Sequence, residues 1–427
     1  MKNFIKSSKT WMFALLCVLF FSIGIKAEAA PGTVTNVKQN GHNSTAVRVE
    51  FTPTTVGNPT SYQLKVYDNK ACTGDPYQTS ELTSGSEAVV YNLSAGKSYY
   101  AQVVAIDKDK TPGAPSAAIE VVTSPNAKVT TLKQGNMTTK KINLSWSAVS
   151  GANCYDVGYK KYGSTADAKF KATTKTSYSI SASADTCYQV AVYPMRKSST
   201  GYVASVEDNL AKSALMYTTP RKVTKLKLYS TGGASRLSNI ATFSAKLSNA
   251  ADGYQYELRG YNNKKITTKT VGLSATNTAN NLIQFKQGLK SGQFMRIRIR
   301  PYVNWNGKKK YVTKWSDYVW FAPTPKTVKA AISPSQRVED GLIISWSKIK
   351  GANNYSVYVS RSRNSGYKRV ATTTSTKYNL RTFNGSQLTT GTYYYYIIAN
   401  KKSGGKTYKS DDSWYFSKSI RVDTYYY

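Results

Sequence analysis

Apolar and polar residues alternate along this chain in short segments, with a period of two residues. The stretch around SWSAVSGANCYDVGYK, residues 145–160, shows the pattern most clearly. Apolar side chains occupy every second position on either side of a glycine-containing corner there, at Ile142, Leu144 and Trp146 and then at Tyr155, Val157 and Tyr159. Such alternation predicts two β-strands, each with one buried face, joined by a short corner.

This unit of strand, corner and strand recurs. It returns as SWSKIKGANNYSVYVS at residues 345–360, and weaker versions surround Tyr62 and Tyr254. The first tyrosines of the four copies, at positions 62, 155, 254 and 355, are separated by 93, 99 and 101 residues. A period of about 100 residues corresponds to one small domain per repeat. We therefore expect an all-β chain of four tandem domains, at residues 30–125, 126–220, 221–325 and 326–427, each burying its own core in an extended array.

The amino-terminal segment has the features of a signal peptide, which we assign to residues 1–29. Lys2, Lys6 and Lys9 precede the apolar run Trp11–Ile25, and small residues end at Ala29. A run of about 15 residues is short for a membrane-spanning helix, which needs about 20. We therefore expect an exported chain without a transmembrane anchor, free in the medium or held non-covalently on a cell wall.

One family resemblance is carried by the first predicted domain. Leu93-Ser-Ala-Gly96-Lys-Ser-Tyr99-Tyr-Ala-Gln-Val-Val-Ala105 follows the two alternating strands, and Pro115-Ser116 and Thr123-Ser-Pro125 close the domain. This order resembles the fibronectin type III domain, and the resemblance repeats four times after the signal peptide. It implies immunoglobulin-like β-sandwiches of two sheets. It also implies that Tyr99 is a tyrosine corner, whose hydroxyl holds the turn before its strand.

Three cysteines follow the predicted signal peptide: Cys72, Cys154 and Cys187. An odd number leaves at least one thiol free or paired between molecules. Under the sandwich fold Cys154 and Cys187 begin neighbouring antiparallel strands, so about six residues at roughly 3.3 Å each separate them. That is beyond the reach of a disulfide. So few cysteines in an exported chain favour a bacterial, Gram-positive type of secreted protein.

Charge changes the picture more than composition does. The formal net charge is +37. Counted over the predicted domains, the net charge is −1, +7, +16 and +12 in chain order. Because charge does not specify a fold, a charge gradient of this size is informative about the binding partners of the chain.

The sequence contains few of the residues and motifs that catalytic sites use. The single histidine, His42, falls in a predicted solvated turn, and no P-loop, HExxH or CxxC motif occurs. The third predicted domain contains three acids, Asp252, Glu257 and Asp317. We therefore expect no enzyme, no cofactor and no metal site.

The third predicted domain carries the one cluster with chemical content. In Met295–Pro301 the isoleucines point inward, so the three arginines line the outer face. Phe294 and Met295 replace the corner tyrosine, and Asn306-Gly307 predicts a hairpin with Trp305 at its tip. We assign nine residues to a candidate binding surface for anions: Arg296, Arg298, Arg300, Trp305, Lys308, Lys309, Lys310, Lys314 and Trp315.

Two interpretations of this surface remain open. Arginine and lysine donate to phosphate, sulfate or carboxylate, and neighbouring aromatic rings stack on sugars or bases. Alternatively, these residues only keep the sheet soluble, and Trp315 fills the space between arginines by cation–π contacts, a local resemblance to cytokine-receptor modules. A charge of +16 exceeds what solubility requires, which favours binding.

These features together predict a non-enzymatic secreted or surface-associated adhesion protein. Its basic carboxy-terminal domains would be retained on an anionic polysaccharide or a teichoic acid-like polymer, with the amino-terminal domains displayed. The alternative is a soluble factor that binds a protein receptor through the first domain's loops, Asp68–Tyr77 and Asp107–Pro115. Nucleic acid is not expected to be the main partner.

Overall fold

The computed structural model of this chain confirms the all-β prediction. It describes residues 29–206, 211–231, 240–277, 281–311, 314–323, 325, 327–332, 341–411 and 418–422. In these ranges the single helical element is a 3₁₀ turn, Leu273–Ala275, and all other regular structure is strand. The predicted signal peptide, apart from Ala29, lies outside the described residues.

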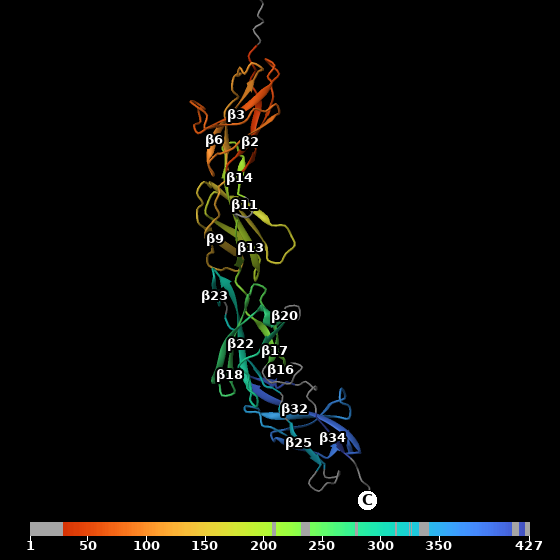
Figure 1. The fold of residues 1–427 in the computed structure, drawn as a ribbon. Coiled ribbons are helices and arrows are strands. Elements are labelled where there is room, and N and C mark those ends of the chain that lie inside the picture. Colours follow the sequence, from red (N-terminus) through yellow and green to blue (C-terminus); the bar gives the residue numbers. More distant parts are fainter. Residues whose placement is uncertain are drawn as a thin grey trace, which may run out of the picture.

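The strands fall into four successive sets, each forming two sheets, and the sets follow one another along an elongated rod (Figure 1). In the first set one sheet has the order β1-β2-β5 and the other β4-β3-β6-β7. Their bounds are β1 (Thr35–His42), β2 (Val47–Thr52), β3 (Ser61–Tyr67), β4 (Gln78–Thr79), β5 (Glu87–Val90), β6 (Ser98–Ile106) and β7 (Ile119–Val122).

The second set repeats this arrangement, with β12-β9-β8 in one sheet and β11-β10-β13 in the other, where β14 and β15 both pair with β13. Its bounds are β8 (Leu132–Gln134), β9 (Lys141–Trp146), β10 (Cys154–Lys161), β11 (Lys169–Thr173), β12 (Ser177–Ser181), β13 (Cys187–Lys197), β14 (Val203–Ser205) and β15 (Lys212–Tyr217). Cys154 and Cys187 do begin adjacent antiparallel strands, and Cys154 pairs with Met195, far along β13 from Cys187. All three described cysteines are free thiols.

The third set has sheets β16-β17-β21-β20 and β19-β18-β22, with β23 and β24 both paired to β22. Its bounds are β16 (Thr224–Thr231), β17 (Ala241–Lys246), β18 (Gly253–Gly260), β19 (Lys265–Gly272), β20 (Thr276–Asn277), β21 (Leu282–Phe285), β22 (Met295–Trp305), β23 (Lys308–Lys310) and β24 (Val319–Phe321).

The fourth set has sheets β25-β26-β29 and β28-β27-β32, with β33 and β34 both paired to β32, and a small hairpin of β30 and β31. Its bounds are β25 (Thr327–Ile332), β26 (Leu342–Trp346), β27 (Asn354–Ser360), β28 (Lys368–Thr373), β29 (Lys377–Leu380), β30 (Thr382–Phe383), β31 (Ser386–Gln387), β32 (Gly391–Ser403), β33 (Lys406–Lys409) and β34 (Lys418–Val422).

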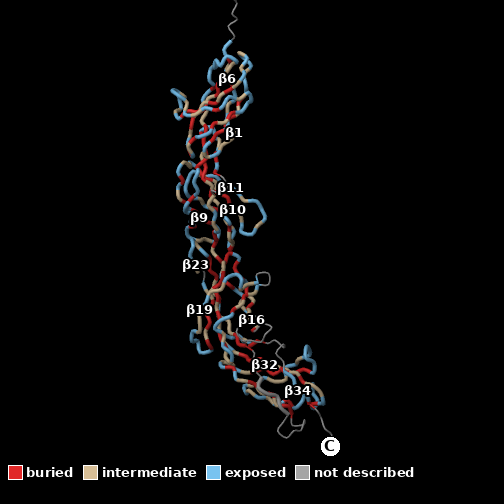
Figure 2. The backbone as a smooth tube through the Cα atoms, in the orientation of Figure 1, coloured by how far each residue is buried: buried red, intermediate tan, exposed pale blue. Residues whose placement is uncertain are grey.

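Each set encloses a buried cluster between its two sheets, seen as red segments along the rod (Figure 2). The recurrent sequence unit places its aromatic residues in the same way each time. Trp146 meets Tyr155 edge to face at 5.5 Å, and Trp346 meets Tyr355 at the same centroid distance. The period-two pattern therefore predicted the inward faces correctly, because successive side chains of a strand point to opposite sides.

Tyrosine hydroxyls hold the turn before the longest strand of three sets. The Ser94 N–H donates to the Tyr99 hydroxyl at 2.9 Å, which confirms the predicted corner. Tyr188 and Tyr393 accept in the same way from Ser183 and Thr389. In the third set the Lys290 N–H instead points at the Met295 sulfur, 3.3 Å away, so methionine replaces the tyrosine as expected.

A second tyrosine anchor was not predicted from the sequence. The tyrosines that begin β10, β18 and β27 accept a backbone N–H from the corner that precedes them. These acceptors are the hydroxyls of Tyr155, Tyr254 and Tyr355. In the last three repeats the first tyrosine therefore fixes the corner between two sheets as well as filling the core, whereas the Tyr62 hydroxyl of the first repeat donates to the Thr54 carbonyl at 3.0 Å.

The corner of each later set rests on the set before it. Gly151 lies against Gly96 so closely that an added Cβ would meet the Gly96 Cα at 2.7 Å. At the next junction Asp185 accepts the Asn249 N–H at 3.1 Å and the Ser248 hydroxyl. At the last one the Phe294 N–H donates to the Lys350 carbonyl at 2.9 Å.

The hairpins after β13, β22 and β32 also fold back onto the preceding set. Tyr202 reaches His42, with 2.7 Å between the hydroxyl and the ring Nδ1. Asn306 exchanges two hydrogen bonds with the backbone of Gln134, at 3.0 and 2.8 Å. Asp411, which follows β33, accepts the Thr231 N–H at 2.6 Å. Each junction therefore has two places at which successive sets are in contact.

The expectation that every domain buries its own core is wrong at the last junction. Phe294 and Ala322 of the third set belong to the buried cluster of the fourth. Phe294, the residue before β22, bonds the corner of the fourth set, and Ala322, the residue after β24, accepts the Asp411 N–H at 3.0 Å, so both side chains lie against that set. The division into four independent domains with the predicted boundaries stays a prediction.

Candidate binding surface

His42, expected in a solvated turn, is the last residue of β1 and contacts the second set instead. Its ring lies edge-on to Tyr202, and Nε2 is 3.3 Å from the Ser205 carbonyl. Burial lowers the pKa of His42, although the Ser205 carbonyl acts against this. The side chain therefore forms a contact between the first and second sets. Across the described ranges no cluster of His, Cys, Asp and Glu has metal-binding geometry.

The outer face of β22 carries the predicted row of arginines. Ile297 and Ile299 are fully buried in the third cluster, while Arg296, Arg298 and Arg300 are half-buried on the opposite face. The predicted orientation of this strand is therefore confirmed.

Aromatic rings lie between these arginines. Arg300 is 4.6 Å from the Tyr311 ring and 4.5 Å from the Trp315 ring, measured from Cζ to the ring centroid. Arg298 is 4.7 Å from Trp315. Arg298 and Arg296 are 4.9 and 4.2 Å from Tyr318. The alternating guanidinium and aromatic planes form a ladder, in which most of each arginine's flat surface is already in contact.

The ladder has further members that sequence reasoning missed. Trp320 lies 5.5 Å from Arg296 and also 4.5 Å from the Lys401 ammonium of the fourth set. Tyr318 and Trp320 stand two residues apart, with the same period as the arginines opposite them. That matching period was the signal that could have identified them.

Glu257 on β18 supports the ladder from the neighbouring strand. Its carboxylate is 2.8 Å from Arg259 and 3.1 Å from Arg298, and Tyr318 also donates to it. Burial alone would raise the pKa of Glu257. The hydrogen bonds from Arg259, Tyr318 and Arg298 outweigh it and lower that pKa to about 2. The carboxylate therefore stays ionised and neutralises part of the arginine charge.

Trp315 was expected on the last strand of its domain, but the structure places it before β24. Ser316 makes two hydrogen bonds with the backbone of Ile299 in place of regular strand pairing. Its N–H donates to the Ile299 carbonyl at 2.8 Å, and its hydroxyl accepts the Ile299 N–H at 2.9 Å. Ser116 and Ser410 make the same pair of bonds in the first and fourth sets. The serine bends the chain and turns Trp315 over the arginines.

The predicted hairpin at Asn306-Gly307 is confirmed, with φ of +48° and +79° at its two central residues. Trp305 is the residue before the turn, and the Lys310 ammonium lies 3.7 Å from its ring centroid. Because Asn306 binds Gln134, this tip is part of the junction with the second set. Trp305 is therefore not a free platform for a ligand.

The nine predicted residues thus divide into three groups. The arginines and Trp315 form the ladder, and Trp305 and Lys310 lie at the junction. Lys308, Lys309 and Lys314 are exposed to solvent. The structure brings the arginines together with Trp315 but does not gather all nine into one pocket.

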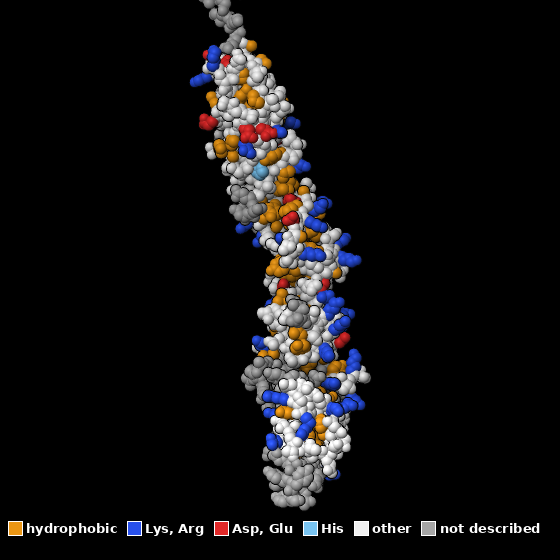
Figure 3. Space-filling view, turned by 90° about the vertical axis from the view of Figure 1, so that its right-hand side faces the viewer, with side chains coloured by type: hydrophobic (Ala, Val, Ile, Leu, Met, Phe, Trp, Pro, Cys, Tyr) orange, Lys and Arg blue, Asp and Glu red, His pale blue; other side chains and the backbone are white. Residues whose placement is uncertain are grey.

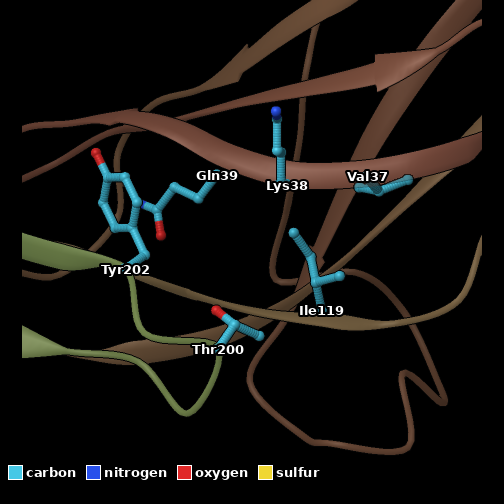
Figure 4. Close-up of a pocket in the computed structure, with 6 residues that line it drawn as sticks. All are labelled: Val37, Lys38, Gln39, Ile119, Thr200 and Tyr202. Atoms are coloured by element: carbon cyan, nitrogen blue, oxygen red, sulfur yellow. The ribbon is translucent and has the colours of Figure 1, made fainter.

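A cavity of about 220 Å³ lies where the hairpin between β13 and β14 of the second set covers the first set (Figure 4). Thr200 and Tyr202 reach it from the hairpin, and four residues line it from β1 and β7: Val37, Lys38, Gln39 and Ile119. No acid and base are paired among these six. The cavity is a gap in a junction and offers no chemistry for catalysis.

Basic side chains are unevenly spread over the rod. In the view of Figure 3, Lys and Arg gather along one edge of the second to fourth sets, and acidic side chains are concentrated on the first. This agrees with the net charges of −1, +7, +16 and +12 along the sequence. Within the ranges described, we find no helical segment with the length and hydrophobicity needed to cross a bilayer.

Comparison with known proteins gives fold-level likenesses only. No family model and no curated protein matches the sequence. The structure is similar to the FN1–FN3 domains of chicken CNTN1, with 15% identity and a TM-score of 0.26 over 68% of this chain and 98% of that one. It is also similar to a two-domain fibronectin type III segment of chicken tenascin, with 13% identity and a TM-score of 0.23 over 43% and 97%. At these TM-scores neither likeness supports a statement about function.

Proposed function

We propose that this chain is an exported, non-enzymatic binding protein, in which the third and fourth strand sets attach to an anionic polymer and the first two sets project from it. Each set would be one fibronectin type III-like domain, with boundaries at residues 30–125, 126–220, 221–325 and 326–427. The polymer would be an anionic polysaccharide or a teichoic acid-like chain. The charge gradient along a rod carries this proposal.

The gradient has physical consequences because the rod keeps its ends apart. The last two sets hold 36 of the chain's 59 basic residues and 8 of its 22 acids. A linear polyanion that lies along them would release its condensed counterions, which makes attachment strong at low salt and weak at high salt. The near-neutral first set would not be drawn to the same polymer.

Both the exposed lysines and the arginines of the ladder would contact the anionic polymer. Lys308, Lys309 and Lys314 are exposed to solvent and offer point charges, and the Lys309 ammonium lies 5.2 Å from the centroid of the Tyr302 ring. The arginines are held in place by the rings, which limits the loss of side-chain freedom when an anion binds. The Nε groups of Arg296 and Arg298 make no hydrogen bond within the described structure.

The proposal is tested by removing charge at matched positions of the full-length protein. Replacing Lys308, Lys309 and Lys314 with glutamine should weaken retention on immobilised heparin and polyphosphate. It should also lower the slope of log affinity against log salt by up to about 1 per lost contact. A control removes three exposed lysines from the first set, Lys70, Lys97 and Lys110. Equal losses in the two variants would contradict the proposal, because only net charge would then matter.

Export and attachment are tested on the producing cells. Cells washed first at low and then at high salt should release the protein only in the second wash. Full recovery in the medium at low salt would contradict retention on the wall. A receptor for the first two sets would then be the next partner to seek.

A further inference from the structure

The outer face of the second set differs from that of the third at corresponding positions. Three residues after the first tyrosine of the repeat, the third set pairs Glu257 with Arg298, inside the ladder. The second set pairs Gly158 with Ala191 at the same place. At this place the second set therefore has small residues where the third set has two long charged side chains.

Phe170 lies over this floor from the edge strand β11. It pairs directly with Gly158, and an added Cβ there would be 2.8 Å from the ring's Cε1 and 3.4 Å from its Cζ. Tyr193 contacts the ring at 6.1 Å between centroids, with the planes tilted by 53°. Phe170 is nevertheless 52% exposed. Part of the ring therefore covers the glycine, and the rest of the side chain meets solvent.

Polar groups of both charges flank the ring. Asp156 and Lys160 stand two residues before and after Gly158, so they share its face of β10. Both side chains are half-buried, which limits their freedom. Lys169 and Lys171, the neighbours of Phe170 along β11, are exposed but lie on the opposite face of the strand. One carboxylate, one ammonium group and a half-exposed aromatic ring therefore share this face of the sheet.

We propose that this surface binds one sugar ring that carries a negative group, as in the uronic acid units of an anionic polysaccharide. The apolar C–H face of a pyranose would lie on Phe170, and the shallow floor at Ala191 would admit its edge. Asp156 would accept hydrogen bonds from sugar hydroxyls, and Lys160 would meet the sugar's carboxylate. The inference rests on the proposed function and narrows its polymer to a glycan.

A purely structural role for Phe170 makes a different prediction. An aromatic side chain laid across a strand glycine stabilises the sheet by covering exposed backbone. Leucine at position 170 would preserve much of that apolar cover but would remove the flat face. Tryptophan would preserve the face. The two roles are therefore separable by substitution at a single exposed site.

The experiment measures binding of full-length protein to hyaluronan octasaccharide and to oligogalacturonate octasaccharide, each compared with a linear polyphosphate of the same charge. Phe170→Leu should weaken binding of an octasaccharide by about tenfold, in the range that loss of one stacked ring produces. Binding of polyphosphate should not change, and Phe170→Trp should bind both sugars and polyphosphate like the wild type. Tyr162→Leu removes another exposed ring of the same set and should have no effect.

Three outcomes overturn the inference while leaving the proposed function intact. Neither octasaccharide binds although polyphosphate does. Phe170→Leu binds both octasaccharides as the wild type does. A single-stranded oligothymidylate binds more tightly than either sugar and depends on Phe170, which would assign the ring to base stacking. Failure of the wild type to bind any polyanion would instead contradict the proposed function itself.

Discussion

Single tyrosine hydroxyls hold the turns of this chain at two recurrent places. At one place the first tyrosine of β10, β18 and β27 binds the preceding corner, and at the other Tyr99, Tyr188 and Tyr393 bind the turn before the longest strand. A buried N–H without a partner costs about 1–3 kcal/mol, so each hydroxyl has a measurable effect.

Tyr99→Phe should therefore destabilise the first set locally. It removes the acceptor of the Ser94 N–H while keeping the ring in the core. The free energy of opening, measured by native-state hydrogen exchange on residues 93–106, should fall by about 1–2 kcal/mol. Tyr100→Phe is the matched control, because that half-buried side chain is on the outer face of the same strand. Similar losses in both variants would contradict the role of the corner.

Among the elements, the glycine-containing corner and the hairpin after the longest strand define how the sets join. In the second and fourth sets the corner reads Gly-Ala-Asn, and its asparagine binds the hairpin backbone of its own set. Arg196 and Lys401 extend from those hairpins to the carbonyls of Gly151 and Gly351, at 3.1 and 3.2 Å. The corner therefore links the core of one set to the surface of another.

Gly151→Ala should loosen the first junction. Its φ is +81°, and its Cβ would meet the backbone of Gly96 at 2.7 Å. Gly163→Ala is a close control, because Gly163 has a φ of +75° with nothing within 4 Å of its Cβ. Limited proteolysis between the first and second sets should become faster in Gly151→Ala alone. Equal acceleration in both variants would mean that backbone strain, not contact between the sets, is responsible.

Over the whole molecule, stiffness and charge act together, because a rod with stiff junctions keeps its basic part away from its neutral part. The first junction contains the single histidine of the sequence, His42. His42 faces the Tyr202 hydroxyl and the Ser205 carbonyl, and the Arg48 side chain lies beside the same strand. A second cation at this place would be repelled by Arg48.

Acidification should therefore loosen the first junction. Because burial lowers the pKa of His42 in the folded chain, the stability due to the neutral ring is complete above a pH of about 6.5. It is lost as the pH falls through the lowered pKa. The distribution of distances between spin labels on the first and second sets should become broader as the pH falls from 7.5 to about 5. His42→Gln cannot gain charge, so its distances should not depend on pH.

The nearby carboxylate does not confound this measurement. Burial opposes ionisation of Glu120, but hydrogen bonds from Ser199 and Ser98 outweigh it and lower its pKa. Glu120 therefore stays charged throughout the window. Unchanged distances in the wild type would contradict the role given to His42.

The strands and their inward faces could be predicted from the sequence, because the pleat is a local property of a strand. Ile297 and Ile299 could be assigned to the core from alternation alone. The Asn306-Gly307 hairpin was predictable for the same reason, since these residue types tolerate a positive φ. The charge of each segment also follows from the sequence without any fold.

Contacts between distant strands were decided only by the tertiary structure. Tyr318 and Trp320 enter the ladder because β24 pairs with β22, and Phe170 covers Gly158 because of the register between β11 and β10. His42 and Phe294 changed environment because another set packs on them, which no local pattern records. The sequence by itself determined strands, turns and charge, since these depend on neighbouring residues. The structure decided which side chains share a surface, since that depends on pairing across tens of residues.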